Sequence, residues 1–192
     1  AKPARRVQDA VQQAYEKGYL GNNILGTNFS LDIVVHLGAG AYICGEETAL
    51  LNSLEGKRGE PRLKPPYFPA VMGLYNKPTL VNNVETISSV PWIIQNSGKE
   101  YSKLGVEGST GTRIFSLSGH VNNPGNFEIE MGKSFGEFID TFGKGIKNNK
   151  NVKAYIPGGA SAPWFTGDQL DIKMTIDDVA NAGSMLGSGA VV

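Results

Sequence analysis

The sequence contains very few of the side chains that cross-link a fold or bind a metal. Among its 192 residues are one cysteine, Cys44, and two histidines, His36 and His120. A single cysteine excludes a disulfide within the chain and leaves almost no basis for a cysteine metal site. The two histidines are isolated, so we predict no metal site and no catalytic triad.

The sequence also lacks an excess of charge of either sign. Lys plus Arg and Asp plus Glu both number 18, so the formal net charge is zero. Nothing therefore predicts a nucleic-acid surface or a polybasic patch for a membrane. No apolar run approaches the roughly 20 residues of a membrane span, and the first residues do not resemble a signal peptide.

Glycine is what the sequence has in excess, since its 25 residues are about twice the usual share. Glycine allows tight turns and a close approach of the backbone to a ligand. The hydrophobic fraction of 40% is enough for a core of useful size. The chain opens without Met in a predicted helix and closes on Gly-Ala-Val-Val, typical of the start of a strand. We therefore expect it to be a piece of a longer polypeptide.

The first 110 residues predict an α/β arrangement. Apolar residues at helical spacing predict a helix over 7–15, and alternating apolar residues predict a strand over 31–37. Gly38-Ala39-Gly40 ends this strand, and a second helix is predicted over 46–54. Strands that alternate with helices are typical of the α/β class.

A long irregular segment follows. Residues 56–80 contain five prolines, which forbid a long helix or a central strand. A loop of this length inside a compact domain is usually functional or disordered. A third helix is predicted to begin at Asn82, because Asn82 and Glu85 resemble a capping box. The polar residues 97–111 then favour a linker.

A separate small unit is predicted after this linker. Residues 113–121 and 126–131 favour two strands, joined by a strong turn signal. Ser134 and Glu137 match a capping box at the start of a helix. Residues 153–156 favour one more strand. The order strand, strand, helix, strand is typical of a β-grasp module.

The most informative stretch is the glycine-rich turn that leads into the helix over 46–54. Such a turn directs backbone N–H groups and the positive helix end toward a ligand. Glu46 and Glu47 are adjacent, so on a helix they point about 100° apart and cannot form a catalytic carboxylate pair. One of them can face the ribose hydroxyls of a nucleotide while the other caps the helix. The alternative is an ordinary turn whose acidic residues favour the helix dipole.

Three polar residues open the third helix. The side chains of Asn82, Asn83 and Thr86 can donate or accept hydrogen bonds beside the free N–H groups of the first turn. Ordinary helix capping explains this pattern, and binding of a phosphate or a flavin is the alternative.

The proline-rich loop is also basic and aromatic. Its cations can hold an anionic nucleotide, and its aromatic rings can stack on a base. The alternative is a solvated surface loop. The residues concerned are Lys57, Arg58, Arg62, Lys64, Tyr67 and Phe68.

Two longer stretches carry a family resemblance. Residues 38–66 read GAGAYICGEETALLNSLEGKRGEPRLKPP, and residues 77–91 read KPTLVNNVETISSVP. Both resemble signature regions of the flavin-bearing, NADH-oxidising subunit of respiratory complex I (NADH:quinone oxidoreductase). Residues 111–132 resemble the start of its ubiquitin-like β-grasp domain, and residues 183–192 resemble its return toward an iron–sulfur domain.

The resemblance implies a fold and a division into domains. It implies that residues 1–110 are part of an FMN/NADH-binding α/β domain and that residues 111–160 are a β-grasp insert of the soluble-ligand-binding type. Residues 161–192 would then connect to an iron–sulfur domain that the chain does not contain.

The same resemblance implies hydride transfer from NADH to FMN, followed by electron transfer through iron–sulfur clusters to quinone. The flavin carries that chemistry, which agrees with the lack of a catalytic residue in the sequence. Flavin subunits of NAD-reducing hydrogenases and NAD-linked formate dehydrogenases share the motifs, so they remain alternatives. A non-catalytic β-grasp binding module is the alternative from another class. We expect the isolated fragment to be inactive.

Site residues follow from the resemblance by position. Six match flavin-contacting positions, and Glu47 also matches a position on the nucleotide side. Phe68 matches the nucleotide side, and Tyr42 and Lys64 are further candidates. The flavin-contacting set is Gly45, Glu46, Glu47, Asn82, Asn83 and Thr86.

The sequence departs from the family pattern in three ways. The family's glycine-rich loop that cradles FMN and NADH is absent, and so are the cysteines that ligate a [4Fe–4S] cluster. Pro65-Pro66-Tyr67-Phe68-Pro69 also has one residue more than the expected Pro-Pro-Phe-Pro. Either Tyr67 or Phe68 therefore takes the family's aromatic position.

The resemblance also implies partners and a location. Besides NADH, the partners would be a thioredoxin-like [2Fe–2S] subunit and a large iron–sulfur subunit of the same complex. The complex would lie peripheral to the inner membrane, on its cytoplasmic or mitochondrial-matrix side. This chain itself would not insert into the membrane.

Overall fold

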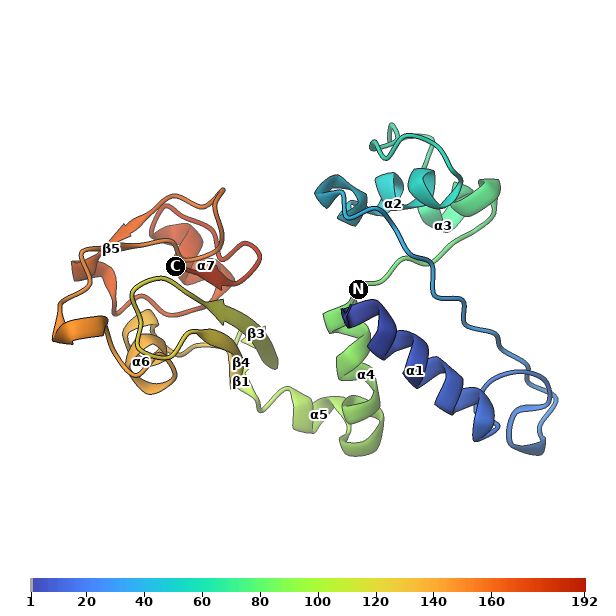
Figure 1. Cartoon of the computed structure of the whole chain (residues 1–192), viewed down its shortest axis with the longest axis horizontal. Coiled ribbons are helices and arrows are strands. Elements are labelled where there is room, and N and C mark those ends of the chain that lie inside the picture. Colours follow the sequence, from blue (N-terminus) through green and yellow to red (C-terminus); the bar gives the residue numbers. More distant parts are fainter. Residues whose placement is uncertain (1) are drawn as a thin grey trace. The chain divides into compact units, whose positions relative to one another are not determined.

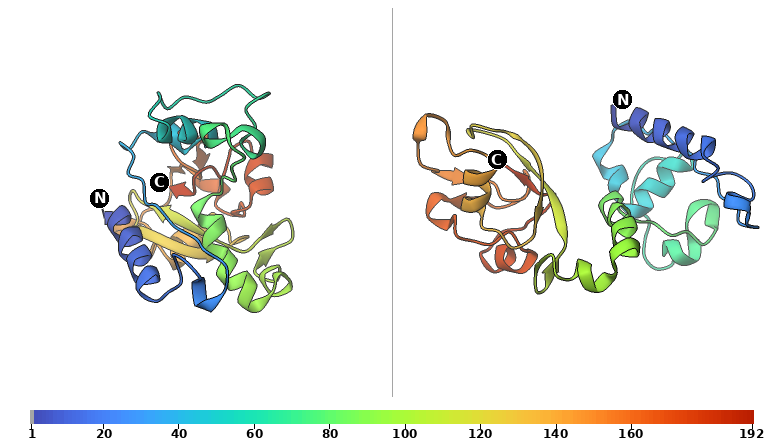
Figure 2. Two further views of the ribbon diagram at one scale, coloured as in Figure 1. Left: turned by 90° about the vertical axis from the view of Figure 1, so that its right-hand side faces the viewer. Right: turned by 90° about the horizontal axis from the view of Figure 1, so that it is seen from below.

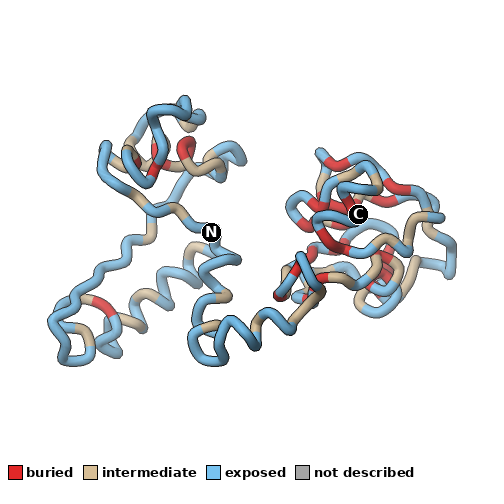
Figure 3. The backbone as a smooth tube through the Cα atoms, turned by 180° about the vertical axis from the view of Figure 1, so that it is seen from behind, coloured by how far each residue is buried: buried red, intermediate tan, exposed pale blue. Residues whose placement is uncertain are grey.

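The computed structural model describes residues 2–192, which fall into two compact units. The first ends at Asn82, and the second runs from Asn83 to Val192 (Figures 1 and 2). Helices and strands occur together in the chain, which confirms the mixed α/β class. Each unit has its own set of elements, and most of the buried residues belong to the second unit (Figure 3).

The first unit is built from helical elements. Its buried apolar side chains include Ala49 and Leu51, so its small core lies along α2. The predicted helices over 7–15 and 46–54 are confirmed as α1 and α2. The elements are α1 (Lys2–Glu16), η1 (Ile24–Gly26), η2 (Tyr42–Gly45), α2 (Glu47–Leu54), α3 (Pro69–Met72) and η3 (Leu74–Asn76).

The predicted strand over 31–37 is wrong. Only Leu31 pairs, as an isolated bridge with Gly21, and residues 32–41 have no regular secondary structure. A strand is held by hydrogen bonds to a neighbouring strand, and none of residues 2–192 forms a ladder with residues 32–37. The alternating pattern does not produce a buried face, because Ile33 and Leu37 are 45% and 60% exposed.

The second unit contains all of the named strands and the helix α4, which is its longest. Asn83 is the N-cap of α4, rather than Asn82 as predicted, and its side chain accepts a hydrogen bond from the Glu85 N–H. Residues 97–111 are not a bare linker, since they form a helical turn and a small hairpin. The first elements are α4 (Val84–Asn96), α5 (Gly98–Tyr101), β1 (Gly105–Val106), β2 (Ser109–Thr110), β3 (Thr112–Leu117) and β4 (Gly125–Glu130).

The remaining elements of this unit are short. Ser134 caps α6 in a capping box with Glu137, as predicted. These elements are α6 (Phe135–Thr141), η4 (Lys147–Asn149), β5 (Ala154–Tyr155), β6 (Phe165–Thr166), η5 (Gly167–Gln169), α7 (Ile176–Asn181) and β7 (Ala190–Val191).

The main sheet has the order β4-β3-β7. β3 and β4 form the predicted antiparallel hairpin, in a register from Thr112↔Glu130 to Leu117↔Gly125 (Figure 2). The third strand differs from expectation. β7 pairs parallel to β3 through Ser116↔Ala190, whereas the predicted strand near 153–156 is observed as β5 and pairs antiparallel with β6.

One hydrophobic cluster fills the second unit. Phe138 of α6 packs against Phe115 and Phe127 of the hairpin, with ring centroids 5.8 and 6.0 Å apart. Met174 and Val179 are fully buried in the same cluster. The segment 161–192, interpreted from the sequence as a connection, therefore contributes to this core.

We predict that Phe138→Ala lowers the unfolding free energy of the second unit by about 3–5 kcal/mol, because it removes a buried aromatic side chain and leaves a cavity. Ile176→Ala is the matched control, since Ile176 is 63% exposed and should lose less than about 0.5 kcal/mol. Urea titration by tryptophan fluorescence is the measurement, because Trp92 and Trp164 both lie in this unit. Equal losses in both variants would contradict the assigned core.

Candidate functional site

The glycine-rich turn leads into the N-terminus of α2, where Glu46 is the N-cap. One carboxylate oxygen of Glu46 accepts hydrogen bonds from the backbone N–H groups of Thr48 and Ala49, at 2.9 and 2.8 Å. The same oxygen accepts a third hydrogen bond, 2.7 Å long, from the Thr48 hydroxyl. Glu46 therefore caps the helix, whereas the Glu47 side chain takes no part in the cap.

The hydrogen bonds also set the ionisation of Glu46. Partial desolvation acts to raise the pKa of this carboxyl group, but the hydrogen bonds from Thr48 and Ala49 and the nearby Lys64 ammonium lower it more, so that its pKa falls below the usual range. Glu46 is therefore an anion at neutral pH, fixed at the positive end of a helix dipole.

Lys64 completes a charged cluster with Glu46 and Glu47. Its ammonium forms a hydrogen-bonded ion pair with Glu47 and lies 3.7 Å from the second oxygen of Glu46. The hydrogen bond to Glu47 raises the pKa of Lys64. All three side chains remain partly exposed, at 29% for Lys64, 32% for Glu46 and 41% for Glu47. We call these three residues the Lys64 cluster.

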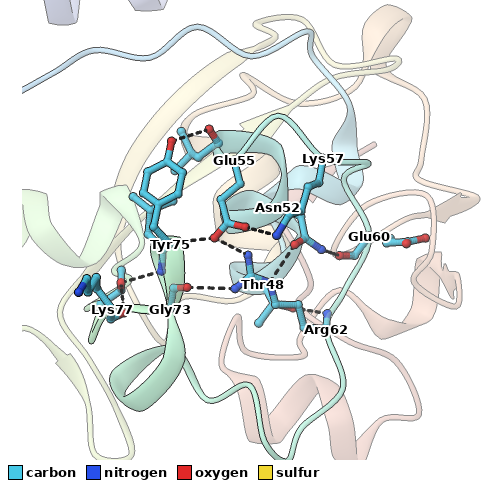
Figure 4. A network of polar contacts seen from close by, with 12 residues as sticks. Thr48, Asn52, Glu55, Lys57, Glu60, Arg62, Gly73, Tyr75 and Lys77 are labelled. Atoms are coloured by element: carbon cyan, nitrogen blue, oxygen red, sulfur yellow. Dashed lines mark hydrogen bonds and ion pairs between the residues drawn. The ribbon is translucent and has the colours of Figure 1, made fainter.

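A buried polar network holds the loop that carries Lys64 (Figure 4). The Arg62 side chain donates from Nε to Asn52 Oδ1 at 2.8 Å and from Nη1 to the Gly73 carbonyl oxygen at 3.0 Å. Its Nη2 lies 2.8 Å from Glu55 Oε1. Position 73 requires glycine, because a Cβ there would lie only 2.8 Å from the Pro69 carbonyl oxygen.

Glu55 is the anion at the centre of this network. Its side chain is 5% exposed and contacts Lys57 and Arg62, at 2.6 and 2.8 Å. It also accepts a hydrogen bond of 2.8 Å from the Tyr75 backbone N–H. The hydrogen bonds from Lys57, Arg62 and Tyr75 lower the pKa of Glu55 to about 2. The network thus joins the C-terminus of α2 to both ends of the proline-rich loop.

The other site residues predicted in the first unit are more exposed. Tyr42 opens η2 with its side chain 96% exposed. Gly45 ends that element, and a Cβ there would meet no atom within 4 Å, so its backbone is open to a ligand. Phe68 is the N-cap of α3 and is 51% exposed, and Tyr67 is 37% exposed.

The three polar residues near the third helix lie at the division between the units. Asn82 is the last residue of the first unit, whereas Asn83 and Thr86 belong to the second. The Asn83 side chain accepts the Glu85 N–H at 2.8 Å, as a helix cap does. Thr86 is exposed in the first turn of α4. Their predicted contact with flavin therefore remains a prediction.

The structure adds three residues to those that the motifs indicated. Thr48, Asn52 and Glu55 lie on one face of α2, at spacings of four and three residues, and all three bond Arg62. The signal in the sequence is the helical spacing of these three polar residues, which predicts one polar face along the helix. Arg62, one of the cations of the basic loop, is bound within the protein instead of facing solvent.

Residues 2–192 supply no cluster of three or more His, Cys, Asp or Glu side chains that could hold a metal ion. No helix in this part of the chain is long and apolar enough to cross a membrane. The acidic and basic groups of the Lys64 cluster are suited to hydrogen bonding and to charge recognition.

Comparison with known families identifies the segment that contains this cluster. Residues 1–92 match the Nuo51 FMN-binding domain of the 51K family of complex I. This match covers the first 92 of the 192 residues. The resemblance to the flavin-bearing protein of complex I, first seen in the motifs, is thereby confirmed for the FMN-binding segment that holds α2 and the Lys64 cluster.

Relatives extend this similarity to nearly the whole chain. The F subunit of the NADH-quinone oxidoreductase of Mycobacterium tuberculosis is 52% identical over 187 residues, which are 97% of this chain and 42% of the relative. The F subunit of Streptomyces coelicolor is 52% identical, over 97% of this chain and 41% of the relative. The F subunit of Rickettsia felis is 48% identical, over 98% of this chain and 45% of the relative. The chain thus spans less than half of the length of these curated relatives.

A solved structure shows the same fold. The crystal structure of an NAD⁺-reducing [NiFe]-hydrogenase in the H₂-reduced state matches with a TM-score of 0.73 and 34% identity. The match covers 84% of this chain and 27% of the hydrogenase chain.

We predict that Glu55→Gln removes an acid-sensitive part of the stability of the first unit. The pKa of Glu55 is lowered in the fold, from 4.5 to about 2, so its stabilisation is present above pH 4.5 and is lost as the pH falls toward 2. Between these pH values the variant should show a flatter loss of stability than the parent. Urea unfolding followed by circular dichroism at several pH values measures this slope, and parallel curves would contradict it.

Proposed function

We propose that the complete protein is the NADH-oxidising flavoprotein subunit of an NADH:quinone oxidoreductase, an enzyme that transfers hydride from NADH to FMN. The Lys64 cluster, with two carboxylates and one ammonium at the N-terminus of a helix, is the observation that carries this proposal. It lies within the segment that matches the FMN-binding family, and the NADH-quinone oxidoreductase relatives match nearly the whole chain.

The residues present fit a flavin and a dinucleotide. A nucleotide requires a cation near its phosphates and hydrogen-bond acceptors near its ribose hydroxyls. Lys64 supplies the cation and Glu47 the acceptor, and both side chains are partly exposed. The open backbone of Gly45 permits a close approach of a planar ring. Exposed aromatic side chains at Tyr42 and Phe68 can stack on a base.

Each residue then has a binding or orienting role. The Lys64 ammonium would contact a phosphate while it keeps one contact with Glu47, since its three N–H donors allow both contacts. Glu46 keeps the helix N-terminus and the Lys64 side chain in place. Asn82, Asn83 and Thr86 would hold polar atoms of the flavin. Bound FMN would supply the redox chemistry, since a flavin takes part in hydride transfer with NADH and in one-electron transfer.

A [4Fe–4S] cluster does not fit the residues of this chain, because such a cluster is held by several cysteine thiolates and the chain has only Cys44. In the complete subunit the cluster would be held by the later cysteine motif of the family.

We propose the family's domain division for this chain. Residues 1–110 would be part of the FMN/NADH-binding α/β domain, and residues 111–160 would be a ubiquitin-like β-grasp domain. The β3–β4 hairpin, the helix α6 and a third strand parallel to β3 support the β-grasp assignment. This third strand is β7, so the segment 161–192 both completes the sheet and leads toward the iron–sulfur domain.

The partners follow from the same proposal. The subunit would assemble with a thioredoxin-like [2Fe–2S] subunit and a large iron–sulfur subunit, and it would pass electrons toward quinone. It would lie peripheral to the inner membrane, on the cytoplasmic or mitochondrial-matrix side. A place in an NAD-reducing hydrogenase is the second candidate, favoured by the structural match. The 52% identity to the NADH-quinone oxidoreductase relative against 34% to the hydrogenase favours the first.

We predict that Glu47→Gln in the complete subunit lowers kcat/KM for NADH by about 10- to 100-fold while FMN stays bound, because a misplaced nicotinamide reacts slowly. Steady-state NADH oxidation with an artificial electron acceptor, together with the flavin content, is the measurement. Glu60→Gln is the matched control, since Glu60 lies in the adjacent loop and only pairs loosely with exposed Arg58, at 3.8 Å. Normal kinetics of Glu47→Gln at full flavin content would remove Glu47 from the site.

A further inference from the structure

Lys64 lies on a loop with little regular structure, yet its ammonium is held against two carboxylates. We propose that Arg62 is a positioning residue that fixes Lys64 opposite Glu46 and Glu47 and thereby sets how tightly the subunit binds NADH. The part that concerns NADH rests on the function proposed for the Lys64 cluster. The positioning itself rests on contacts within the first unit.

The Arg62 side chain makes two hydrogen bonds, from Nε and Nη1, and one ion pair through Nη2, which has no hydrogen-bond partner of its own among residues 2–192. It is 8% exposed and contacts Asn52, Glu55 and Gly73 through Nε, Nη2 and Nη1. A buried guanidinium is stable only when its charge and its donors are paired. Asn52 lies in the last turn of α2, Glu55 is its C-cap and Gly73 precedes η3, so the Arg62 side chain is held at three points (Figure 4).

The backbone of Arg62 provides a fourth contact, and this one reaches the cluster. The Arg62 N–H donates to the Thr48 hydroxyl oxygen at 2.8 Å. That hydroxyl in turn donates to the Glu46 carboxylate at 2.7 Å. A continuous chain of hydrogen bonds therefore links Arg62 to one of the two carboxylates that contact Lys64.

Lys64 follows Arg62 by two residues, so its Cα lies within about 7 Å of the Arg62 Cα. Leu63, the residue between them, is 81% exposed and adds no buried packing that could hold the loop. On its N-terminal side, the Lys64 backbone is therefore held by the anchored Arg62. On the other side, the Leu63 carbonyl oxygen accepts a hydrogen bond of 3.2 Å from the Tyr67 N–H.

Lysine cannot replace arginine in this role. The planar guanidinium donates to Asn52 and Gly73 and at the same time pairs its charge with Glu55, whereas an ammonium is a point charge on a flexible stem. Arg62→Lys keeps the charge that Glu55 requires but loses the fixed contacts with Asn52 and Gly73. The substitution should therefore loosen the loop without leaving a buried carboxylate unpaired.

The first experiment measures the position of Lys64 without relying on activity. The complete subunit and its Arg62→Lys variant are treated with a limiting amine-acylating reagent, and the labelling rate of each lysine is read by mass spectrometry. The pairing with Glu47 raises the pKa of Lys64 and slows its reaction. We expect Lys64 to react about five- to tenfold faster in the variant, because the paired ammonium is released. Lys150, on the exposed surface, should react at an unchanged rate.

The second experiment is a double-mutant cycle with Lys64→Gln, measured as KM and kcat for NADH. Arg62→Lys alone should raise KM about five- to tenfold, the size expected when a charge-assisted hydrogen bond is weakened. It should change kcat less than twofold, and flavin content should stay full. In the Lys64→Gln background the same change should alter KM less than about twofold. Arg5→Lys, an exposed arginine on α1, is the control.

A labelling rate of Lys64 that does not change in Arg62→Lys would overturn the positioning, and so would a KM effect that persists in the Lys64→Gln background. If Lys64→Gln alone leaves KM unchanged, the nucleotide role of Lys64 fails while the labelling still decides the positioning. Asn52→Ala serves if Arg62→Lys folds poorly, because it removes one acceptor of Arg62. It should raise Lys64 labelling in the same direction by a smaller factor, and no rise there would equally overturn the proposal.

Discussion

The buried contact between Arg62 and Glu55 is the constraint on which the first unit depends. Few apolar side chains are buried in this unit, and the loop from 56 to 80 has only short helical turns of its own. The ion pair and its hydrogen bonds replace an apolar core there. Removal of Glu55 would leave the buried Arg62 guanidinium without its counter-charge, and loss of a buried partner of this kind typically costs about 3–5 kcal/mol. The network is therefore what gives this loop a defined path along α2.

The two glutamates at the start of α2 have different tasks because of this constraint. Glu46 accepts two of the free N–H groups of the first helical turn, those of Thr48 and Ala49, which gives the turn a fixed geometry. Glu47 is left with a single partner, Lys64, which the anchored loop presents. A rigid cap beside an exchangeable ion pair is suited to a nucleotide site, since the ligand can replace one contact without disturbing the helix.

Local patterns predicted the parts of the structure that depend on neighbouring residues. The helix at α2, the β3–β4 hairpin and the capping box at Ser134 all follow from residues within a few positions of each other. The adjacency of Glu46 and Glu47 also predicted that one would cap and the other would stay available. The cap of α4 was displaced by one residue, from Asn82 to Asn83, because two adjacent asparagines are equally good caps.

Features that depend on distant partners could not be predicted in this way. The alternation over 31–37 is typical of a strand, but a strand also requires a partner, and none pairs with residues 32–37 in the part of the chain that the structure describes. The parallel pairing of β7 with β3 joins residues more than 70 positions apart. The sequence identifies Arg62 as one cation of a basic loop, but only the fold shows that its partners lie within the protein, at Asn52 and Glu55.

Hydrogen exchange of the complete subunit tests the central claim most directly, namely that NADH binds at the N-terminus of α2 beside the anchored loop. Amide exchange is compared with and without NADH under anaerobic conditions, in peptides that cover residues 42–55, 60–68 and 125–130. We predict slower exchange in the first two segments and no change in the third, which belongs to β4. Unchanged exchange rates in 42–55 and 60–68, at saturating NADH and full flavin content, would contradict NADH binding at this position.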